Sequence, residues 1–195
     1  MKDIANTPLV SIICSTYNHG LYISQCLDGF LMQKTNFPFE ILIHDDASTD
    51  NTPDIIREYE HNQPQVIRPI YQKENKYSKK EDIFAKYQCS RVRGKYIAIC
   101  EGDDYWIDPL KLQKQIDFLE NNPDYGMIYT TSKVYNQKEG KIEEDIIGRE
   151  FNGYIELLSG NCIPTLTTCI RSSLVMEYLK EVEPKSKNWL MGDYP

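Results

Sequence analysis

Residues 9–18 of the chain read LVSIICSTYN, and this stretch decides the fold. Its first six residues are mostly apolar and β-branched, which is typical of a strand buried in a parallel sheet. The polar residues Ser15, Tyr17 and Asn18 follow at the end of this run. Ligands of α/β sheets bind at the carboxyl ends of the strands, so this tip holds the first candidates for function.

Alternating helix and strand patterns continue outward from this stretch. Apolar residues at helical spacing predict a helix over residues 21–32, and a second apolar run predicts a strand over residues 39–44. The next expected elements are a helix from about residue 53, strands over 66–71, 95–100 and 126–135, and helices over 83–92 and 109–121. This order predicts an α/β fold of three layers, α/β/α, with a mainly parallel central sheet.

The pattern is looser after residue 135. We expect an antiparallel strand over 141–147, a short helix over 153–159, a strand over 165–171 and a helix over 172–181. At 195 residues, one domain over residues 1–195 is the expectation.

The composition is that of an acidic globular protein. There are 22 Lys and Arg against 29 Asp and Glu, so the formal net charge is 22 − 29 = −7. Phosphate backbones require a basic face, so this balance argues against a nucleic-acid partner. No apolar run approaches the roughly 18 residues of a membrane span, and the first residues lack the apolar region of a signal peptide. The chain is therefore expected to be cytoplasmic.

The six cysteines form no CxxC pair, and the three histidines are too scattered for a zinc site. In a reducing compartment we interpret the cysteines as small apolar residues of the core.

Paired carboxylates follow two of the predicted strands. Asp103 and Asp104 come after the strand at 95–100, and Mg²⁺ or Mn²⁺ typically takes one or two such carboxylates beside phosphate oxygens. The alternative is an acidic turn that caps the next helix. Asp45 and Asp46 follow the strand at 39–44, where a carboxylate can accept hydrogen bonds from a base or a ribose. The alternative there is capping of the helix near Pro53.

Two residues at the first strand tip could face the same ligand. Tyr17 offers a ring that can stack on a base, although a buried core tyrosine is the plainer interpretation. Ser15 lies on the same strand face as Tyr17 because side chains alternate with a period of two.

The sequence lacks both common phosphate-binding loops, GxGxxG after the first strand and GxxxxGK[ST]. Phosphates would then be met by a metal ion, helped by Arg91, Arg93 or the lysines of residues 73–80. The loop of residues 73–81 is expected to be mobile without a ligand and to close over a bound one.

Three motifs in order resemble family 2 glycosyltransferases of the GT-A fold. They are VSIICSTYN at 10–18, IHDDASTD at 43–50, and GKYIA at 94–98 leading to EGDDYW at 101–106. With Gly192 and Asp193 near the end, the resemblance spans nearly the whole chain. It is similar to bacterial enzymes that build capsule, O-antigen or other exopolysaccharide.

The resemblance implies roles for individual residues. Residues expected to hold the donor nucleotide, a uridine or thymidine diphosphate, are Ser15, Tyr17, Asp45, Asp46 and Asp103. Asp104 would be the direct metal ligand, and Asp193 would be the catalytic base. The chain departs from the family pattern at Glu101 and Gly102, where another Asp is usual. A glycine there would permit close approach of the donor.

The resemblance therefore implies a metal-dependent inverting transfer of a sugar from a UDP- or dTDP-sugar, with Mn²⁺ or Mg²⁺ as cofactor. The acceptor would be a saccharide or a lipid-linked saccharide, which is compatible with a place at the inner face of the membrane. Residues 1–106 would form the nucleotide-sugar half and residues 107–195 the acceptor half, shortened at its C-terminal end.

Two alternatives stay open at this point. One is a binding module for sugar nucleotides, or a truncated fragment, without catalytic activity. The other is a sugar nucleotidyltransferase, which usually carries a glycine-rich basic loop after its first strand. Residues 17–20 read YNHG at that place, which argues against it.

Overall fold

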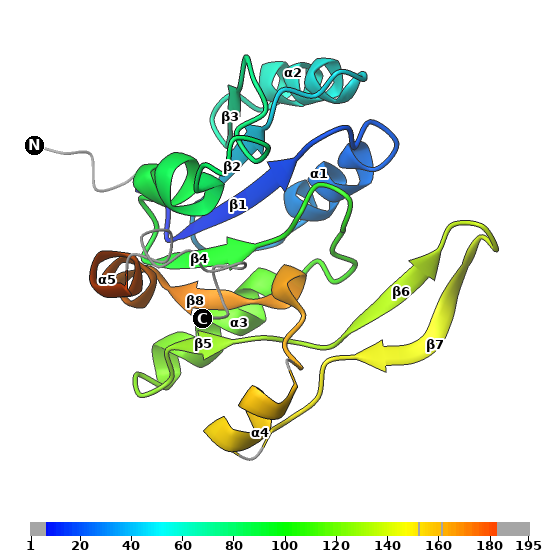
Figure 1. The fold of residues 1–195 in the computed structure, drawn as a ribbon. Helices are drawn as coiled ribbons and strands as arrows, with labels where there is room; N and C mark the ends of the chain where they lie inside the picture. Colours follow the sequence, from blue (N-terminus) through cyan, green and yellow to red (C-terminus); the bar gives the residue numbers. More distant parts are fainter. Residues whose placement is uncertain (1–6, 152, 161, 183–195) are drawn as a thin grey trace, which may run out of the picture.

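The fold is organised around one six-stranded sheet in the order β3-β2-β1-β4-β8-β5 (Figure 1). The computed structural model describes residues 7–151, 153–160 and 162–182. The strands of the sheet are β1 (Val10–Thr16), β2 (Phe39–Asp45), β3 (Ile67–Tyr71), β4 (Tyr96–Ile99), β5 (Met127–Ile128) and β8 (Cys169–Arg171). The first four are parallel, and β8 runs antiparallel to β4 and β5. The sheet is thus mainly parallel, as the sequence predicts.

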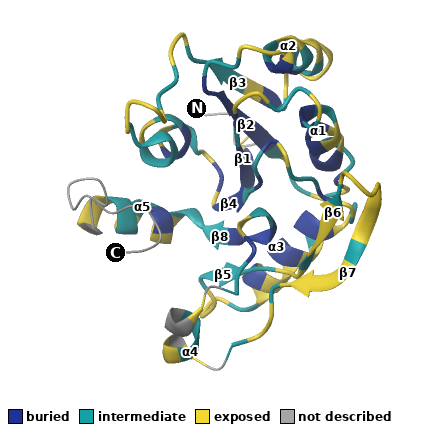
Figure 2. Ribbon diagram, turned by 45° about the vertical axis from the view of Figure 1, so that its right-hand side comes forward, coloured by how far each residue is buried: buried dark blue, intermediate teal, exposed yellow. Residues whose placement is uncertain are grey.

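Helices cover both faces of this sheet. The larger core is shared with α1 (Ile23–Leu31), α2 (Thr52–Asn62) and α3 (Lys111–Asn121). The other face is covered by α5 (Ser172–Val182) and by residues 84–91, where a π-helix (Phe84–Gln88) runs into a 3₁₀ turn (Cys89–Arg91). Figure 2 shows the buried residues concentrated in the central strands between these layers. The three-layer α/β/α arrangement is confirmed.

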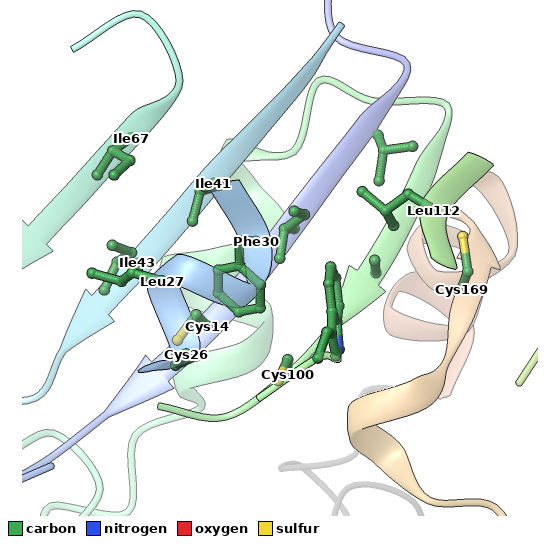
Figure 3. Packing of buried hydrophobic residues seen from close by; sticks show 14 of the residues in the cluster. Cys14, Cys26, Leu27, Phe30, Ile41, Ile43, Ile67, Cys100, Leu112 and Cys169 are labelled. Carbon is green, nitrogen blue, oxygen red and sulfur yellow. The ribbon is translucent and has the colours of Figure 1, made fainter. Parts of the chain in front are cut away.

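Cysteines fill part of the core, as expected. All six are free, and Cys14, Cys26 and Cys100 are fully buried. Figure 3 shows these three side chains near Leu27 and Phe30, where the end of β1 and the chain after β4 meet α1. Burial, followed by the neighbouring thiols, raises the pKa of Cys26, so its thiol stays protonated and acts as an apolar group.

The strand order reverses at β1, which makes its carboxyl end the switch point of the sheet. The chain runs from β1 to β2 and β3 on one side and then returns to β4 on the other. Backbone hydrogen bonds hold both flanking tips to β1: Asp46 N donates to Thr16 O at 3.0 Å, and Gly102 N donates to Ser15 O at 2.9 Å. Neighbouring strands lie about 4.8 Å apart, so the β2 and β4 tips are about 10 Å from each other.

The prediction of one strand over residues 126–135 is wrong. β5 ends at Ile128, and Ser132–Asn136 forms β6, which pairs with β7 (Lys141–Ile147) in a separate antiparallel hairpin. The Thr167 hydroxyl donates to the Thr130 carbonyl at 2.8 Å and accepts from the Thr130 N–H at 3.2 Å. These bonds take the backbone of residue 130 away from the sheet, and the hairpin leaves the body of the molecule (Figure 1).

Two further elements are shorter or differently wound than predicted. Residues 165–171 form a 3₁₀ turn (Thr165–Thr167) and only then β8, which inserts between β4 and β5. The helix predicted over 83–92 is the π-helix and 3₁₀ turn already described. The antiparallel strand at 141–147 and the short helix α4 (Tyr154–Ser159) lie where the sequence predicts them.

Candidate active site

The tip of β1 places Ser15 and Tyr17 at the switch point. Ser15 Oγ accepts a hydrogen bond from Gln88 Nε2 at 3.0 Å. Tyr17 is 43% exposed, so its ring is available to a ligand and is not part of the core. The alternative of a buried core tyrosine is therefore wrong.

The loops after β1 and β2 lock each other in place. Asn18 adopts a positive φ of 55°, its N–H donates to Ser48 Oγ at 2.8 Å, and its Oδ1 accepts from Thr49 N at 2.8 Å. Gly20 N donates to Asp50 Oδ2 at 2.9 Å, and Asp50 Oδ1 accepts from the first residue of α2, Thr52, at 2.9 Å. The start of α2 is thus served by Asp50, which leaves Asp45 and Asp46 for other partners.

Asp46 holds the segment of residues 73–81 against the tip of β2. Its side chain is buried, Oδ1 accepts from Lys76 N at 2.7 Å, and Oδ2 accepts from Tyr77 N at 2.9 Å. His44 lies beneath it, with Nε2 4.0 Å from Asp46 Oδ1 and 3.2 Å from Gln72 Nε2. Burial lowers the pKa of His44, so its imidazole is neutral near pH 7. No sequence pattern indicated this anchoring.

Asp45 points to the opposite face of β2, because successive side chains of a strand alternate. It is buried, and its Oδ2 accepts from Ser48 N at 3.3 Å. Burial raises its pKa above the ordinary value. Asp45 therefore shapes the turn after β2, and its expected contact with the donor nucleotide stays a prediction.

Three carboxylates gather in the turn after β4. Asp104 N donates to Glu101 O at 3.1 Å, which closes the turn. The Asp103 side chain is about half exposed, and its Oδ1 is 3.8 Å from His19 Nδ1. Burial and then the charge of Asp103 raise the pKa of Asp104, and burial and then the charges of Asp104 and Asp103 raise that of Glu101. Carboxylates crowded in this way favour a cation beside them.

Gly102 packs against protein atoms at this turn. A Cβ at this position would lie 2.7 Å from Thr16 Oγ1, 2.8 Å from Thr16 Cβ and 3.1 Å from His19 Nδ1. The glycine is thus required for the fit of the turn on β1. The expectation that it also permits close approach of the donor stays a prediction.

A buried cluster adjoins the turn of residues 101–104, here called the carboxylate turn. Trp106 packs edge-on against Phe30, with ring centroids 4.8 Å apart, and its Nε1 donates to Leu166 O at 2.8 Å. Lys111 Nζ lies 4.0 Å from the Trp106 ring centroid and donates to Gln115 Oε1 at 2.8 Å. Gln115 Nε2 in turn donates to Thr167 O at 2.8 Å. The cluster joins the turn to Leu166 and Thr167, and it was not predicted from the sequence.

The two arginines considered for phosphate binding have other partners. Arg93 Nε donates to buried Glu40 Oε2 at 2.9 Å, at the start of β2 and thus at the opposite edge of the sheet. Arg91 donates to the backbone carbonyls of Ile43, at 3.3 Å, and Arg68. Of the basic groups considered, Lys76 is the one whose backbone contacts a candidate site residue, Asp46.

Comparison with known proteins decides the family. The model of the family described as "Glycosyl transferase family 2" matches residues 11–176 of the chain. The chain belongs to this family. Residues 11–176 contain every site residue expected from the sequence except Asp193, which lies outside the described residues.

Two relatives show which proteins the sequence of this family 2 chain resembles. An uncharacterized protein of Mycobacterium tuberculosis is 43% identical over 137 residues, covering 69% of this chain and 38% of the relative. The Escherichia coli UDP-Glc:α-D-GlcNAc-diphosphoundecaprenol β-1,3-glucosyltransferase WfaP is 33% identical over 131 residues, covering 67% of this chain and 48% of WfaP. The chain thus spans less than half the length of either relative.

Solved structures confirm the GT-A fold. Staphylococcus aureus TarS 1–349 in complex with UDP superposes with a TM-score of 0.63 at 20% identity, covering 90% of this chain and 49% of TarS. The mannosyltransferase PcManGT of Pyrobaculum calidifontis, in complex with GDP-Man and Mn²⁺, gives 0.61 at 19% identity, covering 87% and 46%. Among the described helices of our family 2 chain, none is both long and apolar enough to cross a membrane.

Proposed function

We propose that this family 2 chain carries out sugar transfer from a pyrimidine nucleoside diphosphate sugar to a hydroxyl group, with a divalent cation at its carboxylate turn. One observation carries the proposal. Asp46 and the Asp103–Asp104 pair flank the end of β1 on either side, each tied to it by a backbone hydrogen bond of its own turn. Ser15 and Tyr17 lie between them, so one ligand can contact all of these groups.

The partners of Asp46 favour a pyrimidine base. Each of its oxygens already accepts one backbone N–H, so each keeps one lone pair. The imide of uracil or thymine offers a single N–H and needs only one of them. A guanine edge offers two parallel N–H groups to a carboxylate and would compete with Lys76 N and Tyr77 N for both oxygens. Tyr17 supplies an exposed ring on which the base can stack.

The donor set of the carboxylate turn fits Mg²⁺ or Mn²⁺. Asp104, with Asp103 beside it, offers hard oxygen ligands, and the raised pKa of Asp104 reflects a site that a cation would stabilise. Among the residues that the structure describes, no group of three or more His, Cys, Asp or Glu is arranged to hold a metal ion. In the proposal, Asp104 is a direct ligand and diphosphate oxygens and water complete the shell. When bound, the ion would neutralise the departing diphosphate.

The reaction needs one base and no covalent intermediate. The acceptor hydroxyl oxygen forms the new bond to the anomeric carbon while the bond from that carbon to the diphosphate oxygen breaks, which inverts the configuration. The hydroxyl proton passes to a carboxylate. We assign this role to Asp193 from its place in the family pattern. Asp103 is assigned to the ribose or sugar hydroxyls.

The relatives support the class of donor and acceptor. WfaP is named for a UDP-sugar donor and a lipid-diphosphate acceptor, and the TarS structure holds UDP. PcManGT holds GDP-Man together with Mn²⁺. By analogy we propose a saccharide or lipid-linked acceptor, a role in cell-surface polysaccharide synthesis and a cytoplasmic site of action at the membrane face.

Calorimetric titration of UDP, dTDP, GDP and ADP, each with and without Mn²⁺, tests this function. We expect tight binding of UDP or dTDP only with Mn²⁺, and loss of binding in Asp104→Ala. The matched control is Asp54→Ala on the exposed face of α2, which should bind like the wild type. Preference for a purine diphosphate, or binding that ignores both Mn²⁺ and Asp104, would overturn the proposal.

Donor hydrolysis and transfer then separate an enzyme from a binding module. An enzyme should release UDP from a UDP-sugar with Mn²⁺, and Asp193→Asn should retain nucleotide binding but lose this release. Binding that needs Asp104, with no turnover of any donor by the intact chain, would favour a non-catalytic module.

A further inference from the structure

The hydroxyl of Ser15 is oriented by a side chain from residues 84–91, which cover the sheet face toward which Ser15 points. Gln88 is 3% exposed, ends the π-helix Phe84–Gln88, and donates from Nε2 to Ser15 Oγ at 3.0 Å. The preceding residue, Tyr87, packs on His44 of β2 with ring centroids 5.3 Å apart. Ser15 and His44 are register partners in β1 and β2, so consecutive side chains of one π-helix reach both strand tips. Single-turn π-helices are rare and frequently occur at functional sites.

This contact sets the polarity of the Ser15 hydroxyl. A serine hydroxyl has one proton to donate and two lone pairs. In the orientation that the structure gives to the Gln88 amide, its nitrogen takes one lone pair and cannot accept the proton. The hydroxyl proton therefore points away from Gln88, which leaves it available to a ligand at the strand tip.

The next strand presents the complementary group. Asp46 is an acceptor only, so the two tips together offer a donor at Ser15 and an acceptor at Asp46. A pyrimidine dione such as uracil presents an imide N–H with a carbonyl on each side, which matches this pattern. Cytosine presents an amino donor and a ring nitrogen acceptor in place of the carbonyl and imide at the same positions, so its pattern is reversed.

We propose that Gln88 is a specificity-determining residue that acts through Ser15, and that it makes the site select a pyrimidine dione over cytosine. The inference rests on the proposed function, since it concerns the base of the same donor. Gln88 is a positioning residue, because it fixes the hydroxyl and does not itself touch the base.

Gln88→Glu is the sharpest test, because it keeps the shape of the side chain and reverses its polarity. A carboxylate at this position accepts the Ser15 proton and turns it away from the base. We expect the UDP:CDP affinity ratio, measured by calorimetry with Mn²⁺, to fall about tenfold, the size expected when one polar partner is left without its hydrogen bond. The added charge weakens both nucleotides alike, so the ratio isolates the effect on the base.

A second variant and a double-mutant cycle distinguish the proposed role of Gln88 from a purely structural effect. Gln88→Met keeps the volume without any hydrogen bond, and it should lower the ratio by a smaller factor than Gln88→Glu does. In a Ser15→Ala background, Gln88→Glu should change the ratio no further, because the hydroxyl is gone. Ser90→Ala, at an exposed position of the adjoining 3₁₀ turn, is the control and should keep the wild-type ratio.

Two results would overturn the inference while the proposed function stands. One is a UDP:CDP ratio in Gln88→Glu that stays within twofold of the wild type. The other is a fall in the ratio that persists in the Ser15→Ala background, which would show that Gln88 acts by packing. A wild-type chain that binds neither nucleotide with Mn²⁺ would instead overturn the proposed function, and this inference with it.

Discussion

Lys111 provides a quantitative test of how the carboxylate turn is supported. It is 7% exposed, yet its amine is surrounded by the Trp106 ring, Gln115 and two thiols. Burial lowers the pKa of Lys111 from its ordinary value of 10.5 to about 8. A difference of 2.5 pKa units corresponds to about 3 kcal/mol between the charged and neutral forms at 1.36 kcal/mol each.

The sign of the pH dependence follows from linkage. Below pH 8 the amine carries its proton in both states, and the fold bears the full cost of the buried charge. Between pH 8 and 10.5 the unfolded chain binds more protons than the folded one, so the Lys111 contribution to the free energy of unfolding rises with pH. Between pH 7 and pH 10 this rise is about 2.5 kcal/mol.

Lys111→Met removes this titration while keeping an unbranched side chain in the same space. The variant loses the hydrogen bond to Gln115, which costs about 1–3 kcal/mol at every pH. It also loses the cost of the buried charge, which matters only at low pH. We therefore expect the stability of the wild type relative to Lys111→Met to increase by about 2.5 kcal/mol from pH 7 to pH 10.

Urea unfolding of both proteins at pH 7, 8.5 and 10 measures this difference. Other groups that titrate in this range cancel, because both proteins carry them. Lys114→Met, on an exposed face of the same helix, is the matched control, because it removes a lysine without removing a buried amine. A wild-type advantage over Lys111→Met that is the same at all three pH values would refute the burial argument.

Two further perturbations probe the strand tips. Asp46→Asn should speed tryptic cleavage at the lysines of residues 73–80 several-fold, because the charge-assisted bonds from Lys76 N and Tyr77 N are weakened; unchanged cleavage rates would argue against anchoring by Asp46. Gly102→Ala should destabilise the fold by about 1–3 kcal/mol, because its Cβ would press on Thr16 in a well-packed turn; an unchanged thermal midpoint would contradict that packing.

The parallel half of the sheet could be predicted because burial on both faces leaves a strong pattern. Strands β1, β2 and β4 are short apolar runs, and each is followed by polar residues that do not contribute to a hydrophobic core. Their tips must then meet at one edge of a parallel sheet, which brings Asp46 close to Asp103 and Asp104 without any knowledge of side-chain contacts.

The antiparallel edge could not be predicted in the same way. β5 has two residues and β8 has three, so neither shows a period. The position of β8 between β4 and β5 depends on tertiary hydrogen bonds such as those between Thr130 and Thr167. The π-helix at residues 84–88 was also invisible, because a shift from i→i+4 to i→i+5 bonding leaves the local apolar pattern almost unchanged.

Some of the contacts that were not predicted have a recognisable pattern in the sequence, and others have none. Lys111 and Gln115 lie four residues apart and adjoin Leu112, Ile116 and Leu119 in one stripe of α3, which could have indicated their burial. The bonds from Asp46 to Lys76 and Tyr77 use backbone N–H groups, which every residue except proline carries. No side-chain pattern marks such a contact in a sequence.

Strand geometry also explains why the adjacent residues Asp45 and Asp46 have different partners. Asp45 and Asp46 point in opposite directions, because consecutive side chains at a strand end alternate between the two faces. One of them is therefore committed to its own turn, through Ser48 N, while the other faces the loop and the proposed base. Asp103 and Asp104 lie in the turn after β4, where Asp103 is half exposed near His19 and Asp104 is more buried. The pair at the tip of β2 thus supplies one carboxylate for its own turn and one for the proposed ligand, whereas both carboxylates after β4 are proposed to contact the donor or its cation.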